Sequence, residues 1–377
     1  MTSVPTFLDF FAGSGLVSEG IKPWLKTIWS NDICQKKALV YAANHSDHPM
    51  VVKDICELSA SSIPEADVSW ASFPCVDLSL AGNLAGITGK RSGLVWKWLE
   101  LMENMFSPPP VLVIENVAGL ISASDSVHYR QLHMALSRMG YNVGPLLKNA
   151  DKWVPQSRLR VFIIAVKQGV PIDDFVQNSP SWAFPNALLE SGRGLENLVF
   201  WKVPVPLDSL PKLVDVLDLN APCDNDFKRN RNIEMIPKVH LERLLRDPAD
   251  ISAAPGYKRT RAGKQVLELR FDGIAGCLRT PKGGSSRQYV VIKAGTELRT
   301  RLLTVREVAR LMGAPETFKI PGTYNDAYAA MGDAVALPVV SFLAQHLIYP
   351  LANRCKHYRG DLEIHVQKVT QSSFAPA

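Results

Sequence analysis

The stretch TFLDFFAGSG, residues 6–15, decides the fold. Its first six residues form a short, mainly apolar and aromatic run, which predicts a buried strand. The turn Gly13-Ser14-Gly15 follows at once, and glycine lets backbone N–H groups approach a ligand at the start of the next helix. A dinucleotide-binding fingerprint needs a third glycine, but Leu, Val and Ser follow Gly15. The stretch therefore predicts a ligand-binding turn and disfavours NAD, although a plain loop would also use these glycines.

The same pattern of apolar run, turn and helical periodicity recurs along the first half of the chain. We expect strands at residues 6–11, 27–30, 68–72, 111–115 and 161–166, and helices at 94–105 and 129–139. Strands that alternate with helices predict an α/β fold with a doubly wound, Rossmann-like parallel sheet. Ligands of such sheets bind beyond the carboxyl ends of the strands, so the strand-to-loop junctions are the places to search for chemistry.

The composition changes near residue 167, where Pro, Asn, Asp and Ser become frequent and strands no longer alternate with helices. Helical periodicity returns at residues 302–312 and 335–347. We expect a catalytic domain at 1–168, a smaller, mostly irregular or β domain at 169–325, a segment at 326–366 that returns to the catalytic domain, and a polar tail at 367–377.

Basic residues concentrate in the expected smaller domain. Residues 228–264 carry ten Lys or Arg against four Asp or Glu, and residues 279–310 carry eight against two. The whole chain has a net charge of only +6, which permits a polyanionic partner without requiring one. A solvated charged surface would show the same local excess.

The composition is that of a globular protein of two or three domains, with 377 residues, 46% hydrophobic and 21% charged. Six scattered cysteines without a C-x-x-C pair disfavour a disulfide framework and a metal site. We find no basic N-terminal region before an apolar run, and expect no window of roughly 18 uncharged apolar residues. These features predict a cytoplasmic protein without a membrane segment.

Two acidic residues lie before the strand expected at 68–72: one just after the strand at 27–30, and one after a further short strand between them. Asp32 stands about twenty residues after the glycine turn, where a carboxylate can accept hydrogen bonds from ribose hydroxyls. Asp54, just before Ile55, is placed to meet an adenine amino group. Either acid alone would also suit a surface or capping position, but together with the turn they predict an adenosine pocket.

A cysteine and a glutamate stand at the next two junctions. Cys75 follows the strand at 68–72 within Ser72-Phe73-Pro74-Cys75, and a following helix N-terminus would favour its thiolate. A lone cysteine is more often a buried apolar residue. Glu115, however, ends the next strand, so neighbouring strands would bring a thiol and a carboxyl to one crevice.

Six motifs in order extend the pattern over most of the chain. They are Phe-Ala-Gly-Ser-Gly at 11–15, Phe-Pro-Cys at 73–75, Glu-Asn-Val at 115–117, Gln-Ser-Arg-Leu-Arg at 156–160, Thr-Val-Arg-Glu at 304–307 running on to Arg-Leu-Met-Gly at 310–313, and Met-Gly-Asp-Ala-Val at 331–335. Through these motifs the chain resembles the cytosine-C5 DNA methyltransferase family of the bacterial or phage modification type. The unpatterned stretch between the fourth and fifth motifs falls where that family keeps its target recognition domain.

The resemblance implies methylation of carbon 5 of a cytosine within a specific double-stranded DNA sequence, with S-adenosylmethionine as the methyl donor and no metal. It implies that the Cys75 thiolate adds to C6 of a flipped-out base and that Glu115 assists at N3. Arg158 matches the arginine near the base's O2. Arg160 either orients Glu115 or forms a structural ion pair.

The resemblance also implies the binding residues. For the donor they are Phe11, Ala12, Gly13, Ser14, Gly15, Asp32, Asp54, Ile55, Pro74, Leu94, Asp333 and Val335. For DNA they are Asn83, Arg91 and Ser92 in the mobile loop at 82–93, and Lys282, Ser285, Ser286 and Arg287 in the smaller domain. Arg306, Glu307 and Arg310 are expected to scaffold that domain.

The chain departs from the family pattern at two positions. Leu16 stands where the family often has a further glycine, and Asp333 stands where an asparagine is usual. A carboxylate accepts hydrogen bonds but does not donate them, so the contact of Asp333 with the methionine part of the donor is in question. Capping of a helix is its alternative role.

The family type suggests a monomer encoded by a bacterium or phage, acting beside a separate restriction endonuclease. Three alternatives remain open. An RNA cytosine-C5 methyltransferase of the transfer-RNA type would share the donor pocket and the Pro-Cys and Glu-Asn-Val motifs, but the roughly 110 residues between Lys167 and Cys277 favour DNA. A nicotinamide-dependent dehydrogenase would not explain Cys75 with Glu115. An inactive DNA-binding relative would not need every catalytic position filled.

Overall fold

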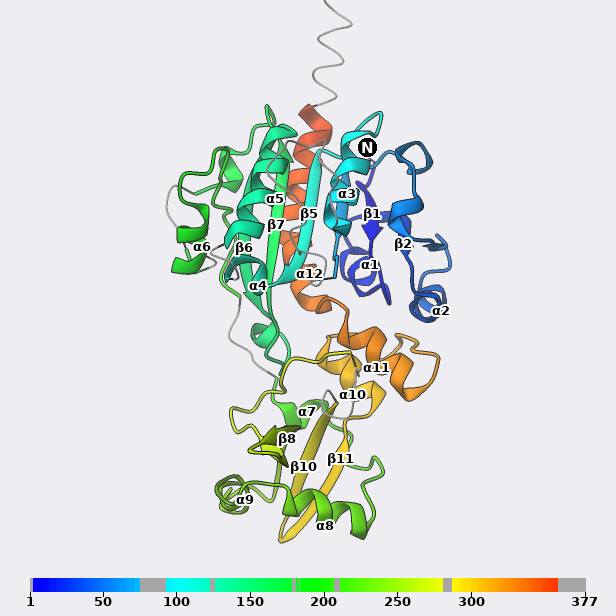
Figure 1. Ribbon diagram of the computed structural model, residues 1–377. Coiled ribbons are helices and arrows are strands. Elements are labelled where there is room, and N and C mark those ends of the chain that lie inside the picture. Colours follow the sequence, from blue (N-terminus) through cyan, green and yellow to red (C-terminus); the bar gives the residue numbers. More distant parts are fainter. Residues whose placement is uncertain are drawn as a thin grey trace, which may run out of the picture.

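The computed structural model describes residues 3–74, 93–122, 126–177, 181–182, 184–206, 211–280 and 287–358. Two sheets organise this part of the chain, a large one with helices on both faces and a small one below it (Figure 1). The α/β fold class predicted from the sequence is confirmed.

The large sheet has seven strands in the order β3-β2-β1-β4-β5-β7-β6. They are β1 (Thr6–Phe10), β2 (Lys26–Asp32), β3 (Val51–Val52), β4 (Val68–Ala71), β5 (Val111–Val117), β6 (Tyr141–Asn149) and β7 (Leu159–Lys167). The first five strands pair in parallel, whereas β7 runs antiparallel to both β5 and β6. The sheet is therefore mixed at one side, which the prediction of a parallel sheet did not include.

Strand β6 has no counterpart among the expected strands because it contains Gly144 and Pro145, residues that normally disfavour a strand. In the fold, Gly144 allows the indole of Trp201 to lie directly against the backbone, and a Cβ at this position would collide with the ring. The Trp201 Nε1 also donates to the Gly144 carbonyl at 3.0 Å. The glycine is thus a packing requirement within the strand.

The helices are α1 (Leu16–Ile21), α2 (Gln35–Asn44), α3 (Leu94–Glu103), α4 (Gly119–Ser122), α5 (Val127–Arg138), α6 (Asn186–Gly192), α7 (Leu213–Val216), α8 (Asp226–Glu234), α9 (Lys238–Leu245), α10 (Val305–Leu311), α11 (Tyr324–Gly332) and α12 (Leu337–Leu343). In the view of Figure 1, α5 lies in front of the large sheet and α12 behind it. The helices expected near residues 94, 129, 302 and 335 are present, with ends shifted by a few residues.

The small sheet is antiparallel and has the order β11-β10-β8-β9. Its strands are β8 (Ile251–Arg261), β9 (Lys264–Leu269), β10 (Gln288–Ala294) and β11 (Glu297–Leu302). Alternate residues of β10 face different cores: Val290 and Ile292 join the main core, while Tyr289 and Val291 join a separate core with Leu267. The small sheet therefore has its own core and also packs against the rest of the protein.

The carboxyl ends of the parallel strands point toward α10, α11 and the small sheet (Figure 1). The Ser14 hydroxyl, just after β1, donates to the Ala330 carbonyl of α11 at 3.1 Å. The junctions that the sequence singled out thus lie at the boundary between the two sheets.

One expectation about apolar segments was wrong. The segment Tyr324–Tyr358, which holds α11 and α12, contains a window long and apolar enough, by length and composition, to cross a membrane. Within the protein, 56% of that window is buried. Because α12 supplies Val340 and Leu343 to the main core, the apolar character follows from packing behind the sheet.

Candidate active site

The turn after β1 has an unusual backbone. Phe11, Gly13 and Gly15 all have positive φ values, of 57°, 57° and 84°. A Cβ on Gly15 would lie 2.6 Å from His45 Nε2 and 2.8 Å from Tyr41 Cδ2, so α2 packs too closely for any larger residue. The sequence Gly-x-Gly is therefore explained both by the left-handed conformation and by the approach of α2.

Asp32 holds this turn in place. Its carboxylate accepts hydrogen bonds from the backbone N–H of Gly13 at 2.9 Å and of Cys34 at 2.8 Å. Asp54 lies beyond the neighbouring strand and accepts from Cys56 N at 2.9 Å, which caps the short 3-10 helix Ile55–Glu57. Since β1, β2 and β3 are adjacent, the fold brings the turn and both acids to one edge of the sheet.

Asp333 ends α11 beside the same turn, but it is already paired. Its Oδ2 lies 2.8 Å from the ammonium of Lys37 in α2, and its Oδ1 accepts from the Thr280 hydroxyl. The Lys37 side chain in turn borders the Gly13 turn, since a Cβ at Gly13 would lie 3.9 Å from Lys37 Cδ. The unusual carboxylate therefore has a cation as its partner, which the sequence analysis did not identify.

Glu115 stands near the carboxyl end of β5, and 7% of its surface is exposed. Burial raises the pKa of Glu115 above its ordinary value, against the lowering influence of Arg160, Arg158 and a hydrogen bond from Ser72. A raised pKa increases the share of the carboxyl that is protonated at any given pH. This is the property that a proton donor to a base nitrogen needs.

Asn116 connects this strand end to the segment after β4. Its Nδ2 donates to the Phe73 carbonyl at 2.9 Å, a buried contact across 43 residues. The Trp70 indole donates to the Ser72 hydroxyl at 2.8 Å, which fixes the same segment from its other side. The residues just before Cys75 in the sequence are thus attached to the strand that carries Glu115.

The two arginines of the Gln-Ser-Arg-Leu-Arg motif occupy different surroundings. The Nε of Arg160 lies 3.1 Å from Glu115 Oε1. Arg158 is buried, and its guanidinium donates to the carbonyls of Leu278 at 3.0 Å, Gly332 at 3.0 Å and Ala334 at 2.6 Å. Arg160 therefore faces the acid, whereas Arg158 joins two backbone segments, one at residue 278 and one at residues 332–334.

Gln156 works with Arg158 in that junction. Its Nε2 donates to the Leu311 carbonyl at 2.6 Å, and its Oε1 accepts from Leu278 N at 3.1 Å. Asn116 and Gln156 belong to motifs that the sequence analysis quoted, although it gave them no role. Lys37 offers no such signal, because a lysine on an amphipathic helix is ordinarily a surface residue.

The expected scaffold of the smaller domain contains a buried ion pair. Glu307, fully buried, lies 2.7 Å from Arg301 and accepts from the backbone N–H of Thr304 and of Asp218. Arg310 pairs with Glu316 at 2.7 Å and donates to the Val216 carbonyl at 3.1 Å. Arg306 donates to the Phe318 carbonyl at 2.9 Å.

Several predicted residues lie outside the described part of the chain. They are Cys75, Asn83, Arg91, Ser92, Lys282, Ser285 and Ser286. Of the others, Val335 is buried, Leu94 is half-buried at the start of α3, and Pro74 is exposed. Arg287 immediately precedes β10. Among the described residues, no group of three or more His, Cys, Asp or Glu side chains could hold a metal ion.

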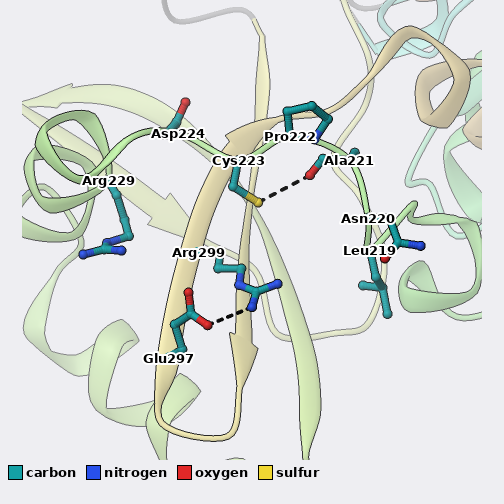
Figure 2. A pocket seen from close by; sticks show the side chains of 9 residues that line it. All are labelled: Leu219, Asn220, Ala221, Pro222, Cys223, Asp224, Arg229, Glu297 and Arg299. Carbon is teal, nitrogen blue, oxygen red and sulfur yellow. Dashed lines mark hydrogen bonds and ion pairs between the residues drawn. The ribbon is translucent and has the colours of Figure 1, made fainter.

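A surface pocket of about 410 Å³ lies beside the small sheet, between the segment before α8 and strand β11 (Figure 2). Arg229, Glu297 and Arg299 line it together with Cys223. Glu297 and Arg299 bind each other at 2.8 Å, and Arg229 pairs with Asp226 at 3.0 Å. None of the nine lining residues is a predicted site residue, and the pocket is separate from the strand ends described above.

Comparisons with known proteins agree on one family. The family model for C-5 cytosine-specific DNA methylase matches residues 5–349. Type II methyltransferase M.FnuDI of Fusobacterium nucleatum is 26% identical over 357 residues, which cover 93% of this chain and 96% of the relative. Type II methyltransferase M.BsuFI of Bacillus subtilis is 25% identical over 341 residues, covering 90% and 71% respectively.

A solved structure shares the fold. The Entamoeba histolytica methyltransferase EhMeth matches with a TM-score of 0.59 at 15% identity, covering 91% of this chain and 98% of that chain.

Proposed function

The chain belongs to the C-5 cytosine-specific DNA methylase family, which makes it a DNA cytosine-C5 methyltransferase, and we propose a mechanism in which Cys75 is the nucleophile. The observation that carries the proposal is the connection at the end of β5. Glu115 faces Arg160 there, and the next residue, Asn116, holds the Phe73 carbonyl two residues before Cys75. The catalytic acid and the chain that leads into the nucleophile are thereby joined.

The proposed reaction begins with addition of the Cys75 thiolate to C6 of the cytosine, while Glu115 delivers its proton to N3. This addition makes C5 electron-rich, so C5 would take the methyl group from the donor's sulfonium, whose S–CH3 bond would break to leave a neutral thioether. A base then removes the C5 proton, the C6–S bond breaks, and the proton on N3 returns to Glu115. The buried position of Glu115 favours the protonated form that the first step needs.

We propose that Arg160 is the arginine that acts at the base, and that Arg158 is structural. Arg160 contacts Glu115, so its guanidinium orients the carboxyl and adds positive charge where the ring gains electrons. Arg158 has three backbone carbonyls as partners and is buried behind them. The resemblance alone had implied that Arg158 lies near the base and that Arg160 orients Glu115 or forms a structural ion pair.

S-adenosylmethionine is the proposed methyl donor, bound at the turn from Phe11 to Gly15. The two glycines at positive φ leave little side-chain bulk in the turn, which suits close approach of a ligand. Asp32, Asp54 and Ile55 stand on the adjacent strand ends, where the adenosine part would lie. Ala12, Ser14, Pro74, Leu94 and Val335 complete the proposed contacts.

Double-stranded DNA is the proposed substrate, with the target cytosine flipped out of the helix. The proposed DNA contacts are Asn83, Arg91, Ser92, Lys282, Ser285, Ser286 and Arg287. The smaller domain, proposed at 169–325, would read the sequence, and the curated relatives named Type II methyltransferases suggest a restriction-modification role in a bacterial cytoplasm. A separate endonuclease and a monomeric enzyme complete this proposal.

Methyl transfer from a radioactive donor tests the proposal. We expect incorporation into duplex DNA from a methylation-free host, and no incorporation with Cys75→Ser, while the matched control Cys223→Ser remains active. Glu115→Gln should slow turnover by about 10²-fold or more but still bind DNA. Labelling of transfer RNA with no labelling of duplex DNA would contradict the DNA assignment, and substantial methylation by Cys75→Ser would contradict the mechanism.

A further inference from the structure

The donor turn has an acidic neighbourhood. Asp32 binds the Gly13 N–H, and Asp333 stands at the end of α11 on the side of Lys37. Two carboxylates near one turn would repel a ligand that carries a carboxylate of its own. The proposed donor carries such a group in its methionine part.

Lys37 is the cation that directly contacts Asp333. Its ammonium lies 2.8 Å from Asp333 Oδ2, and its side chain is only 21% exposed. Burial lowers the pKa of Lys37, but Asp333 and Asp32 raise it by more, so the lysine remains charged. Arg158 also lies near Asp333, but the hydrogen bonds of its guanidinium go to Leu278, Gly332 and Ala334.

The pair joins elements that are far apart in the sequence. Lys37 belongs to α2, whose side chains pack beneath Gly15, and Asp333 immediately follows Gly332. A Cβ on Gly332 would lie 2.8 Å from the Arg279 backbone, and the Thr280 hydroxyl donates to Asp333 Oδ1. The Asp333 carboxylate is therefore held in place, and moving it away from Gly13 would break its contacts with Lys37 and Thr280.

We propose that Lys37 is a positioning residue for the methyl donor, because it neutralises Asp333 and so lets the turn accept the donor's methionine carboxylate. The pair Lys37–Asp333 then replaces the neutral asparagine usual at this position in proteins that the sequence resembles. This inference rests on the proposed function, since it concerns the same donor pocket.

The test measures donor affinity in four forms of the full-length protein: unsubstituted, Lys37→Met, Asp333→Asn and the double variant. Isothermal titration with S-adenosylmethionine should show binding weakened about tenfold by Lys37→Met. The double variant should bind the donor within about twofold of the unsubstituted protein, because the pair carries no net charge in either form. Lys36→Met is the matched control, since Lys36 is adjacent in α2 and pairs with Asp326 instead.

Decarboxylated S-adenosylmethionine provides a second measurement. Because it lacks the carboxylate, Lys37→Met should barely alter its binding. Unchanged affinity of Lys37→Met for the normal donor would overturn the inference, and so would a double variant that binds as weakly as Lys37→Met, or an equal loss with both ligands. Thermal melting of each variant verifies folding. If the unsubstituted protein bound no donor at all, the proposed function itself would be refuted.

Discussion

Replacing each arginine of the Gln-Ser-Arg-Leu-Arg motif by methionine separates the two roles assigned to them. Methionine keeps much of the apolar stem and removes the guanidinium. Arg158→Met should chiefly lower stability, because Leu278, Gly332 and Ala334 lose a donor at their carbonyls. Arg160→Met should chiefly lower activity, because its partner is the carboxyl of Glu115.

The size of the stability loss follows from these contacts. A hydrogen bond to a charged group contributes about 1.5–3 kcal/mol, and there are three for Arg158. Burial opposes this gain, as it also lowers the pKa of Arg158 to about 10. A net loss of about 4 kcal/mol is therefore reasonable for Arg158→Met. With an unfolding entropy of about 0.8 kcal/mol per kelvin for a chain this long, the melting temperature should fall by about 5 °C.

Arg160→Met should cost less stability because its partner can become neutral. Removing Arg160 takes away an influence that lowers the pKa of Glu115, so this pKa should rise further and the buried carboxyl should bind a proton. We expect kcat to fall by about 10²-fold and the pH limb governed by Glu115 to move upward.

Thermal melting at pH 6 and single-turnover methylation across a pH series measure both effects. A larger melting decrease for Arg160→Met than for Arg158→Met would refute the division of roles. So would normal turnover of Arg160→Met.

Three further changes test other parts of the structure. Burial raises the pKa of Asp9 from 3.8 to about 7, so the protonated carboxyl contributes its full stability to the folded protein below about pH 4, and this contribution is lost as the pH rises through 7. The melting temperature of Asp9→Asn should therefore rise relative to that of the unsubstituted protein between pH 4 and 8, and parallel curves for the two proteins would contradict this. Burial lowers the pKa of Lys148 to about 7, so the neutral amine contributes its full stability to the folded protein above about pH 10.5, and this contribution is lost as the pH falls through 7. Lys148→Met should therefore melt at a higher temperature than the unsubstituted protein at pH 6. A lower melting temperature would show that the contact of the Lys148 ammonium with the Trp182 ring, at 3.5 Å, outweighs the cost of burial. Gly15→Ala should weaken donor binding and lower stability more than Gly13→Ala. Both glycines have positive φ, but only a Cβ at position 15 would lie within 2.8 Å of Tyr41 and His45. Equal effects of the two substitutions on equilibrium unfolding and on calorimetric titration with the donor would contradict the packing argument.

The sequence predicted the fold class correctly from local signals, and the family and the enzyme through the resemblance that its six motifs carry. A strand, a glycine turn and an acid at a fixed distance can be found by periodicity and spacing. Strand β6 was missed because its Gly144 and Pro145 contradict strand propensity, and only the contact with Trp201 explains the glycine. The antiparallel insertion of β7 likewise depends on pairing between distant segments.

The partners of the site residues could not be read from spacing. Arg158 and Arg160 are two apart, which in a strand would put both on one face, but β7 begins at Leu159 and leaves Arg158 free to turn toward Gly332. The contact of Lys37 with Asp333 joins residues almost 300 positions apart. The roles of the individual residues, and the domain boundaries near 168 and 325, stay predictions.

Covalent trapping is the measurement that tests the central claim most directly. A duplex that carries 5-fluorocytosine at the target position blocks removal of the C5 substituent, so the enzyme should remain attached at C6 after methyl transfer. Proteolysis and mass spectrometry should then locate the adduct, in the presence of S-adenosylmethionine, on the peptide that contains Cys75. An adduct on another cysteine, or efficient methylation of normal DNA with no trapped complex, would contradict the account.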